Sequence, residues 1–467
     1  MKRFLSIFIL IALIMTAVLT GCDLNDGTEF DENDKSSVAS SEGPAPEGTG
    51  DNVEESKPSE SAGESESDTK AESTPSASED KTPEKEPEKE PEQEPEKDPV
   101  LAEFDVYQSN SITPSGNNYA LKSSNGKKTT GTFRGLFKIQ EYGELEYKFY
   151  FSNNVDSTSI HGTTRNMDTS SYKIVSATVG VVSPMKGSGK IYDEQTVTFD
   201  GKETKNVQPA EKYWSDAIII DVDNGEYLAF EWTVEYTMIP ATLSENTISI
   251  FDYSSGSIGI ATAAPMPDMI GCKRENAVRI GFIGDSITMG VGAGNKNHMF
   301  WSAQITEEIG EEYSTWNLGL GYARANDVVN SPAFLEKAKQ NDIIVICFGV
   351  NDLNSGGRTS TQIRNDIETI AEACREAGAE VILFTTPPYA YAEGKVPAWQ
   401  QLVTKLKALA NDNGYELFDF AAILGDPEDP SKYIYGDHPN QAGCTAVADA
   451  FMESGIIEKV VSRIKGE

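Results

Sequence analysis

The stretch Gly281-Phe282-Ile283-Gly284-Asp285-Ser286-Ile287-Thr288 joins an apolar run to a helix-like segment, and the rest of the chain is best understood outward from it. Residues 278–283 are apolar enough to form a buried strand. Ser286 then stands at the carboxyl end of a parallel strand, where α/β sheets place their ligands. Its Oγ can be exposed there, while its N–H lies at a helix N-terminus that favours negative charge. The alternative is that Asp285 and Ser286 only cap the helix, as both residue types often do.

Strands and helices alternate from residue 270 to the end of the chain. Very apolar segments followed by amphipathic ones indicate a parallel sheet that is covered by helices on both faces. We expect strands at residues 278–283, 314–318, 343–348, 380–385 and 416–419. The expected helices cover residues 300–310, 325–330, 333–340, 361–378, 398–413 and 441–461.

Polar or glycine residues follow the strands of this predicted sheet and a late loop. Asn317-Leu318-Gly319 ends the second strand, Gly349-Val350-Asn351-Asp352 follows the third, and Gly436-Asp437-His438-Pro439-Asn440 lies in the loop. Each group alone has an ordinary explanation as a turn, a cap or a loop. Because parallel strands end at one edge, we expect Ser286, Gly319, Asn351 and His438 to converge there.

These four blocks resemble those of the GDSL/SGNH hydrolases. Gly284-Asp285-Ser286 is similar to the nucleophile block, and His438-Pro439-Asn440 is similar to the block that carries the base. Asn317-x-Gly319 and Gly349-x-Asn351-Asp352 resemble the two blocks that supply oxyanion donors. The resemblance covers residues 275–465 and implies a flavodoxin-like three-layer α/β/α domain that hydrolyses esters. The pairing with an N-terminal β domain is similar to certain carbohydrate acetyl esterases.

The chain departs from the family pattern at two positions. Tyr322 stands where the second block often has a further glycine, and Tyr435 stands where the triad acid usually precedes the histidine by three residues. The nearest carboxylate is Asp437, but neighbouring side chains in an extended segment point apart. Three alternatives stay open: Asp437 is the acid of a triad, Ser286 and His438 act as a dyad, or a carboxylate distant in the sequence is the acid.

The resemblance implies acyl transfer to water through an acyl-enzyme on Ser286, with His438 as the base. The N–H groups of Ser286 and Gly319 and the Asn351 amide are the expected oxyanion hole. No cofactor and no metal is expected. The expected substrate is an acetylated extracellular polysaccharide. The alternatives are a lipase, lysophospholipase or thioesterase of the same fold, and a non-catalytic carbohydrate-binding surface lipoprotein.

Residues 100–268 favour a different architecture. Leu145, Tyr147, Phe149 and Phe151 alternate with polar residues, and residues 227–236 do the same, which is typical of half-buried strands. Several such strands without long helical patterns predict an all-β sandwich or jelly roll, followed by the hydrolase domain at 269–467. Trp214 and Trp232 are candidates for a sugar-binding platform, with a place in the core as the alternative.

The N-terminal residues predict export and a lipid anchor. Lys2 and Arg3 precede an apolar run that ends in Leu19-Thr20-Gly21-Cys22, which resembles a bacterial lipobox. Residues 1–22 are therefore expected to be a lipoprotein signal with lipid attachment at Cys22, and a plain secretory signal is the alternative. Residues 23–99 are rich in Pro, Glu, Ser and Lys and predict a disordered linker. The expected location is the bacterial cell surface.

Composition excludes several classes of function. The formal net charge is −35, and about 26 acidic and 7 basic residues lie between Asp23 and Asp98, so nucleic acid is not an expected partner. The chain has three histidines, His161, His298 and His438, which makes a histidine-based zinc site improbable. The cysteines show no metal-ligand spacing. Nothing in the sequence indicates an oligomeric state.

Overall fold

The structure of the protein is a computed structural model that describes residues 98–161, 169–183, 190–274, 277–293, 297–425, 434–435 and 437–466. The predicted signal segment with Cys22, and the linker up to residue 97, lie outside the described residues. Residues 91–467 form one compact unit. In the described part of the chain, no helix combines the length and the apolar composition needed to cross a bilayer.

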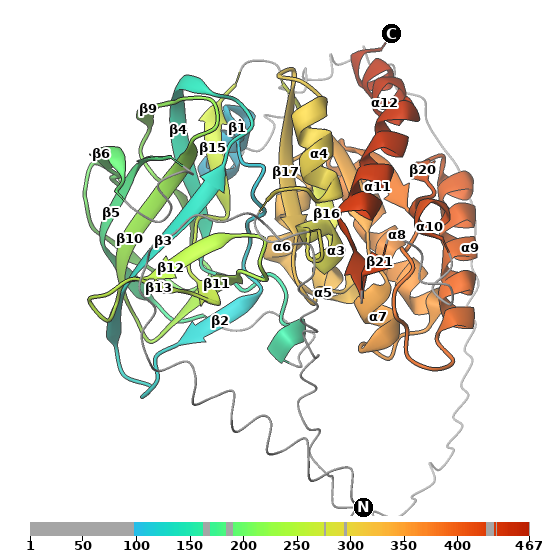
Figure 1. The fold of residues 1–467 in the computed structure, drawn as a ribbon, viewed down its shortest axis with the longest axis horizontal. Helices are drawn as coiled ribbons and strands as arrows, with labels where there is room; N and C mark the ends of the chain where they lie inside the picture. Colours follow the sequence, from blue (N-terminus) through green and yellow to red (C-terminus); the bar gives the residue numbers. More distant parts are fainter. Residues whose placement is uncertain are drawn as a thin grey trace, which may run out of the picture. The chain divides into compact units, whose positions relative to one another are not determined.

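Residues 98–274, called the β region from here on, consist mainly of antiparallel strands (Figure 1). They begin with α2 (Pro99–Ala102) and a short 3₁₀ helix η1 (Glu103–Asp105), and a second one, η2, covers Ser159–His161. The strands are β1 (Tyr107–Ser109), β2 (Tyr119–Lys122), β3 (Thr129–Lys138), β4 (Gly143–Ser152), β5 (Tyr172–Val182), β6 (Tyr192–Thr196), β7 (Lys205–Val207), β8 (Lys212–Trp214), β9 (Ile218–Val222), β10 (Tyr227–Tyr236), β11 (Met238–Leu243), β12 (Ser249–Asp252), β13 (Gly259–Ile260), β14 (Ala263–Ala264) and β15 (Met269–Lys273).

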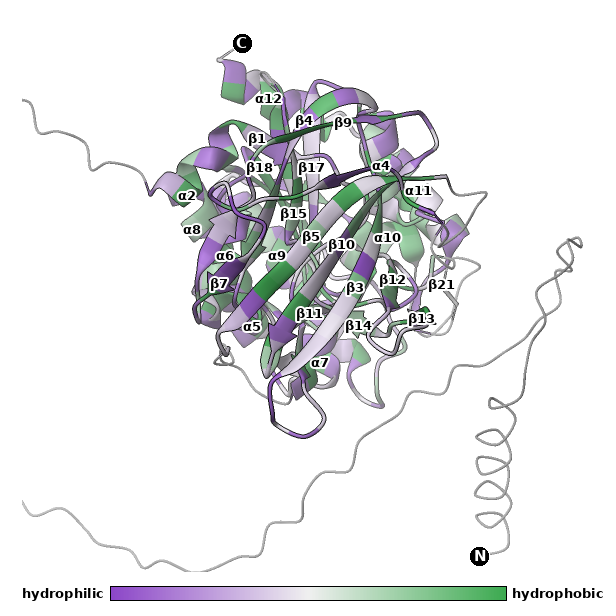
Figure 2. Cartoon of the chain, turned by 90° about the vertical axis from the view of Figure 1, so that its left-hand side faces the viewer, coloured by the Kyte–Doolittle hydropathy of each residue, from purple (hydrophilic) through white to green (hydrophobic). Residues whose placement is uncertain are grey.

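Antiparallel sheets of the β region pack on a shared core. One sheet has the order β1-β15-β4-β8 with β9 on β4, and another has the order β13-β12-β3-β10-β5-β6 with β7 on β5. Buried and less buried side chains alternate along β3 and along much of β5 and β10, which lie side by side in Figure 2. The rings of Phe149 on β4 and Phe230 on β10 lie 5.0 Å apart, so the inner faces of these sheets meet. The predicted β-rich region is therefore confirmed.

Residues 277–466, the α/β region, contain a parallel sheet in the order β17-β16-β18-β19-β20. The first strand of this region, β16, thus lies second in the sheet, which is the flavodoxin-like order with its switch point beside β16. The strands are β16 (Val278–Gly284), β17 (Tyr313–Gly319), β18 (Ile343–Cys347), β19 (Glu380–Phe384) and β20 (Glu416–Phe418), and the small pair β21 (Ile434–Tyr435) and β22 (His438–Pro439) lies apart from them. The helices are α3 (Ser286–Met289), α4 (Trp301–Glu308), α5 (Ala325–Asn330), α6 (Pro332–Ala338), α7 (Val350–Asn354), α8 (Ser360–Glu376), α9 (Val396–Asn413), α10 (Phe420–Leu424), α11 (Gln441–Glu453) and α12 (Ile456–Lys465).

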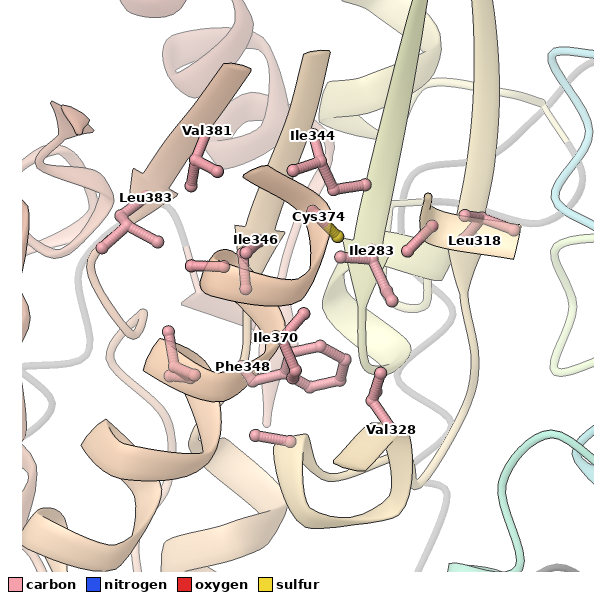
Figure 3. Close-up of a cluster of buried hydrophobic side chains, with 14 of the residues drawn as sticks. Ile283, Leu318, Val328, Ile344, Ile346, Phe348, Ile370, Cys374, Val381 and Leu383 are labelled. Carbon is pink, nitrogen blue, oxygen red and sulfur yellow. The ribbon is translucent and has the colours of Figure 1, made fainter. Parts of the chain in front are cut away.

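Alternate side chains of the parallel strands pack into separate hydrophobic cores on the two faces of the sheet. On β18, Ile344 and Ile346 pack with side chains of α5, α8 and α9, as Figure 3 shows for one part of this cluster. Ile343, Val345 and Cys347 point to the other face, toward α4, α11 and α12. Each fully buried aliphatic side chain contributes roughly 1.5–3 kcal/mol. The expected parallel sheet with helices on both faces is confirmed.

The β region and the α/β region are joined by buried polar groups. Lys337 of α6 is 2% exposed, and its Nζ lies 2.7 Å from Asp156 Oδ2 and 2.8 Å from Asp268 Oδ1. Trp316 of β17 donates from Nε1 to the carbonyl oxygen of Asp268 at 3.2 Å. Removing one member of such a buried ion pair leaves an uncompensated charge, so this junction resists separation.

Several expectations change at this junction. β15 pairs with β1 and β4, so it belongs to the β region, although the predicted boundary at 268/269 assigns it to the hydrolase domain. Trp232 is 2% exposed and is core, while Trp214 packs on Phe104 and donates from Nε1 to the Val100 carbonyl oxygen, so neither forms an exposed platform. The cysteines that the structure describes are free and buried: Cys272, Cys347, Cys374 and Cys444.

Candidate active site

Ser286 is the first residue of α3, directly after the end of β16. Gly284 pairs with Gly319 on β17 and with Cys347 on β18, so three strands end beside the serine. A Cβ at Gly284 would overlap Thr288 Oγ1 and the Cys347 carbonyl, which requires glycine there. Asp285 caps the helix, since its Oδ1 accepts the Ile287 N–H at 2.9 Å. Asp285 and not Ser286 is therefore the cap, which leaves the serine hydroxyl available.

The structure brings Ser286 and His438 together. The Ser286 Oγ lies 2.9 Å from His438 Nε2, within hydrogen-bond distance. His438 lies on β22, and the following Asn440 caps α11 by accepting the Gly443 N–H at 2.9 Å. Gly292, with a φ of 93°, packs so closely on His438 that a Cβ there would overlap the histidine Cβ. The imidazole is thus held between a glycine turn and a helix start.

The surroundings of His438 favour its neutral form. Burial lowers the pKa of His438 to about 4, and the charge of Asp437 only partly opposes this. The ring of Tyr389 lies 5.7 Å from the imidazole in an edge-to-face arrangement. A histidine with this pKa is neutral at pH 7 and can accept a proton from Ser286.

Asp437 is engaged by another residue. The Tyr389 hydroxyl donates to its carboxylate, and burial together with this carboxylate raises the pKa of Tyr389. Within the described residues, no carboxylate accepts a hydrogen bond from Nδ1 of His438. Tyr435, at the usual position of the triad acid, pairs with His438 through the backbones of β21 and β22. The described contacts therefore support the dyad and give Asp437 the role of a partner for Tyr389.

Asn351 lies in the first turn of α7, after Gly349 with a φ of 127°. One hydrogen of its Nδ2 is donated to the Ala323 carbonyl at 3.1 Å, which fixes the side-chain amide and leaves the second hydrogen for an oxyanion. The next residue, Asp352, is fully buried and accepts the Ala325 N–H at 3.2 Å. Both contacts tie α7 to the loop that follows β17.

Gly319 does not supply the oxyanion donor that the sequence predicts. Its N–H donates to the Asn317 Oδ1 at 2.8 Å, so this hydrogen is already used within β17. A Cβ at Gly319 would overlap the backbone of Thr288 and Met289, which explains why glycine is needed. Gly319 permits close packing of β17 against α3, which is a structural role that the spacing alone did not reveal.

Tyr322 is the residue of this loop that sequence reasoning did not assign to the site. It has a φ of 66°, in the left-handed region that favours glycine, and its side chain is 51% exposed. Within the described part of the chain, its N–H has no hydrogen-bond acceptor. The available signal is its position three residues after Gly319, where the family pattern often has glycine.

The other two histidines lie elsewhere. His161 Nε2 accepts the Ala120 N–H at 3.1 Å in the β region. His298 is buried, at 5% exposed, and its Nε2 lies 2.8 Å from Thr113 Oγ1. Burial lowers the pKa of His298 to about 3. Neither histidine is a second base for Ser286. Among the described residues, no cluster of His, Cys, Asp and Glu could hold a metal ion.

Known proteins resemble part of this chain. An acetylxylan esterase of Xylanibacter ruminicola is 24% identical over 252 residues, which cover 44% of this chain and 51% of that protein. The chain thus spans about half the length of this curated relative.

Solved structures are also similar. A lipolytic protein of the G-D-S-L family from Veillonella parvula is 20% identical and covers 38% of this chain and 97% of its own, with a TM-score of 0.33. Est24, a carbohydrate acetylesterase from Sinorhizobium meliloti, is 20% identical with coverages of 38% and 97% and a TM-score of 0.32. At these scores the structural likeness decides nothing about activity.

The family comparison covers the residues of the candidate site. Residues 282–446 match the GDSL-like Lipase/Acylhydrolase family. This segment contains Ser286, Asn351 and His438, which occupy the strand ends and the loop described above. The α/β region of this chain therefore carries a domain of the GDSL-like lipase/acylhydrolase family.

Proposed function

We propose that the protein is a serine ester hydrolase that removes acetyl groups from an extracellular polysaccharide. The observation that carries the proposal is the 2.9 Å distance between Ser286 Oγ and Nε2 of a neutral His438. The likeness to an acetylxylan esterase supports the acetylated carbohydrate as substrate.

In the proposed reaction, His438 Nε2 takes the Ser286 proton while Oγ attacks the ester carbonyl carbon. The carbonyl oxygen becomes an oxyanion that is held by the N–H of Ser286 and the free hydrogen of Asn351 Nδ2. Protonated His438 gives its proton to the leaving alcohol. Water then attacks the acyl-enzyme with His438 again as base, which releases acetate and restores the serine.

The catalytic unit in this proposal is a dyad. Asp437 accepts from Tyr389, and this contact fixes the tyrosine against the edge of the imidazole. The Asp437 charge still stabilises the imidazolium that forms during the reaction, because it raises the pKa of His438. The electrostatic contribution of Asp437 is therefore smaller than that of a hydrogen-bonded triad acid.

The proposal includes attachment to the bacterial cell surface by lipid at Cys22. Two acyl chains suffice for stable anchoring. An extended Pro-rich linker of about 76 residues reaches up to ~230 Å at ~3.1 Å per residue, far enough to present the folded part to an external polymer. Metabolic labelling with a fatty-acid probe tests this part, and equal labelling of wild type and Cys22→Ala would contradict it.

The activity is tested with Ser286→Ala beside Ser462→Ala, a serine on α12 outside the site. We expect Ser286→Ala to lose release of acetate from acetylated xylan and of p-nitrophenol from its acetate, while Ser462→Ala retains both. Unchanged turnover in Ser286→Ala would refute the serine mechanism. A preference for p-nitrophenyl esters of long fatty acids over the acetate would replace the acetylated polysaccharide by a lipid substrate.

A further inference from the structure

The turn between β11 and β12 holds Glu245 in an unfavourable backbone conformation. Glu245 and Asn246 have φ values of 39° and 62°, and the Thr247 N–H donates to the Ser244 carbonyl at 2.8 Å. Two successive positive φ angles are typical of a type I′ turn, whose first central position favours Asn, Asp or Gly. Glutamate at that position costs roughly 1–2 kcal/mol relative to glycine. A strained residue of this kind suggests a role for its side chain.

The carboxyl group of Glu245 lies over the loop that follows β17. A Cβ on Gly321 would overlap both carboxylate oxygens of Glu245, so the carboxylate occupies the place where a side chain at residue 321 would begin. The Asn118 side chain holds the two segments together, because it bonds both to the Gly321 loop and to the end of β11. Its Nδ2 donates to the Gly321 carbonyl at 3.1 Å, and its Oδ1 accepts the Leu243 N–H at 3.1 Å.

The loop that contains Gly321 contacts the segments that carry Ser286 and Asn351. The N–H of the preceding Leu320 donates to the Gly284 carbonyl at 3.1 Å, two residues before the nucleophile. The carbonyl of Ala323 accepts from the Asn351 amide. Glu245 therefore reaches, from the β region, the segment that runs between Ser286 and Asn351.

The Glu245 carboxyl group has no internal partner in the part of the chain that the structure describes. Its Oε1 is buried without a hydrogen bond, and no cation neutralises the group. Burial raises the pKa of Glu245 to about 7. Leaving a buried acceptor unsatisfied costs about 1–3 kcal/mol. The other oxygen, Oε2, is not among the buried atoms, so it is the one that a ligand hydroxyl can reach. The exposed Tyr322 lies close enough for the charge of Glu245 to raise its pKa, and its side chain carries no positive charge that could pair with the carboxylate.

We propose that Glu245 is a specificity-determining residue that accepts hydrogen bonds from the free hydroxyl groups of a carbohydrate ester bound at Ser286. This inference rests on the proposed function and assigns part of the substrate site to the β region. A carboxylate suits the role because its accessible oxygen is a charged acceptor for a sugar hydroxyl. Simple aryl acetates have no hydroxyl to offer, so Glu245 would distinguish between the two classes of ester.

The test measures binding without turnover. Acetylated xylo-oligosaccharides are titrated calorimetrically at pH 8 into Ser286→Ala and into the double variant Ser286→Ala/Glu245→Gln. A lost hydrogen bond to a charged group corresponds to about a 10–100-fold weaker affinity. We expect at least tenfold weaker binding in the double variant. Glu194→Gln in the same background is the matched control, since it lies on β6 at the opposite edge of the sheet that contains β12.

A second variant separates recognition from structure. Glu245→Gly relieves the left-handed strain, so its melting temperature should equal or exceed that of the wild type while oligosaccharide binding falls. A drop of the melting temperature by more than about 5 °C would indicate a structural role and overturn the inference. Equal binding by Ser286→Ala and the double variant, or no oligosaccharide binding by Ser286→Ala, would overturn it too. Failure of the esterase function itself is seen separately, in the comparison of wild type with Ser286→Ala on p-nitrophenyl acetate.

Discussion

The α/β region and the β region place functional groups by different means. In the α/β region, Ser286 and Asn351 follow the ends of neighbouring parallel strands, so the sheet itself brings them to one edge. In the β region, the groups that reach this edge are Asn118 and Glu245, which lie in a loop and a turn. The comparison teaches that reactive groups follow from the topology of one sheet, whereas groups that select a substrate can arrive from loops of another. Substitutions in each region test whether its groups act in this way.

The largest effect is expected from removal of the base. His438→Ala should lower kcat for p-nitrophenyl acetate by about 10⁴-fold or more, because Ser286 loses the proton acceptor that lies within hydrogen-bond distance of its hydroxyl. Assays of p-nitrophenol release compare purified His438→Ala with Ser286→Ala, and kcat should fall by a similar factor in both variants. A rate within tenfold of wild type would show that another group acts as base.

Next comes the junction between the two regions. Lys337→Ala should lower the free energy of unfolding by about 3–5 kcal/mol, because Asp156 and Asp268 stay buried without their cation. Lys407→Ala is the control, since its ion pair with Asp419 is exposed and contributes at most about 1 kcal/mol. Urea unfolding measures both. Equal stability of the two variants would mean that the buried ion pairs of Lys337 do not hold the regions together.

Asn351→Ala should lower kcat by about 10²–10³-fold, since one oxyanion donor is lost. Its KM for p-nitrophenyl acetate should change much less, because the donor acts on the transition state. Circular dichroism should confirm that the Asn351→Ala variant keeps its fold although the contact with Ala323 is lost. A change in KM with constant kcat would instead assign Asn351 to substrate binding.

The pH profile is expected to show a low acidic limb. Only neutral His438 accepts the serine proton, and burial lowers its pKa to about 4, so the active form persists as pH falls until that value is reached. The kcat/KM for p-nitrophenyl acetate should therefore change little between pH 7 and 5, fall to half near pH 4, and be about tenfold lower near pH 3. A midpoint near 6.5 would show that the imidazole is as solvated as in a free peptide.

The smallest effect is expected from Asp437→Asn. Because the Asp437 carboxylate accepts from Tyr389, kcat should fall less than about tenfold, far from the ~10⁴-fold loss that removal of a triad acid causes. Tyr389→Phe should act in the same direction and by a similar amount. A loss of about 10³-fold or more in Asp437→Asn would restore the triad.

Topology explains why so much of the α/β site could be predicted from the sequence. Apolar strands ending in Gly-Asp-Ser and Gly-x-Asn-Asp must bring these residues to one edge, so Ser286 and Asn351 needed no knowledge of tertiary contacts. Gly319 was misassigned because a glycine needed for close packing and one needed for an exposed N–H look alike in a sequence. Only the Asn317 hydrogen bond tells them apart.

Glu245 could not be predicted for a related reason. Ser244-Glu245-Asn246-Thr247 contains one residue that favours positive φ, Asn246, and nothing in this turn indicates that its glutamate faces Gly321 in a different region of the chain. Contacts between distant loops depend on how two cores dock. The buried contacts of Lys337 decide that docking here, and a lysine in a helix is otherwise expected at the surface.

The paired hydrogen bonds of Asn118 have a consequence for binding energetics. Because one amide holds both the Leu243 N–H and the Gly321 carbonyl, the turn that carries Glu245 and the loop that carries Tyr322 are fixed to each other before a substrate arrives. The loss of conformational entropy in these segments thus occurs during folding and does not weaken substrate binding. For the proposed polysaccharide substrate, a preorganised rim of this kind would let weak contacts with several hydroxyl groups add up to selective recognition.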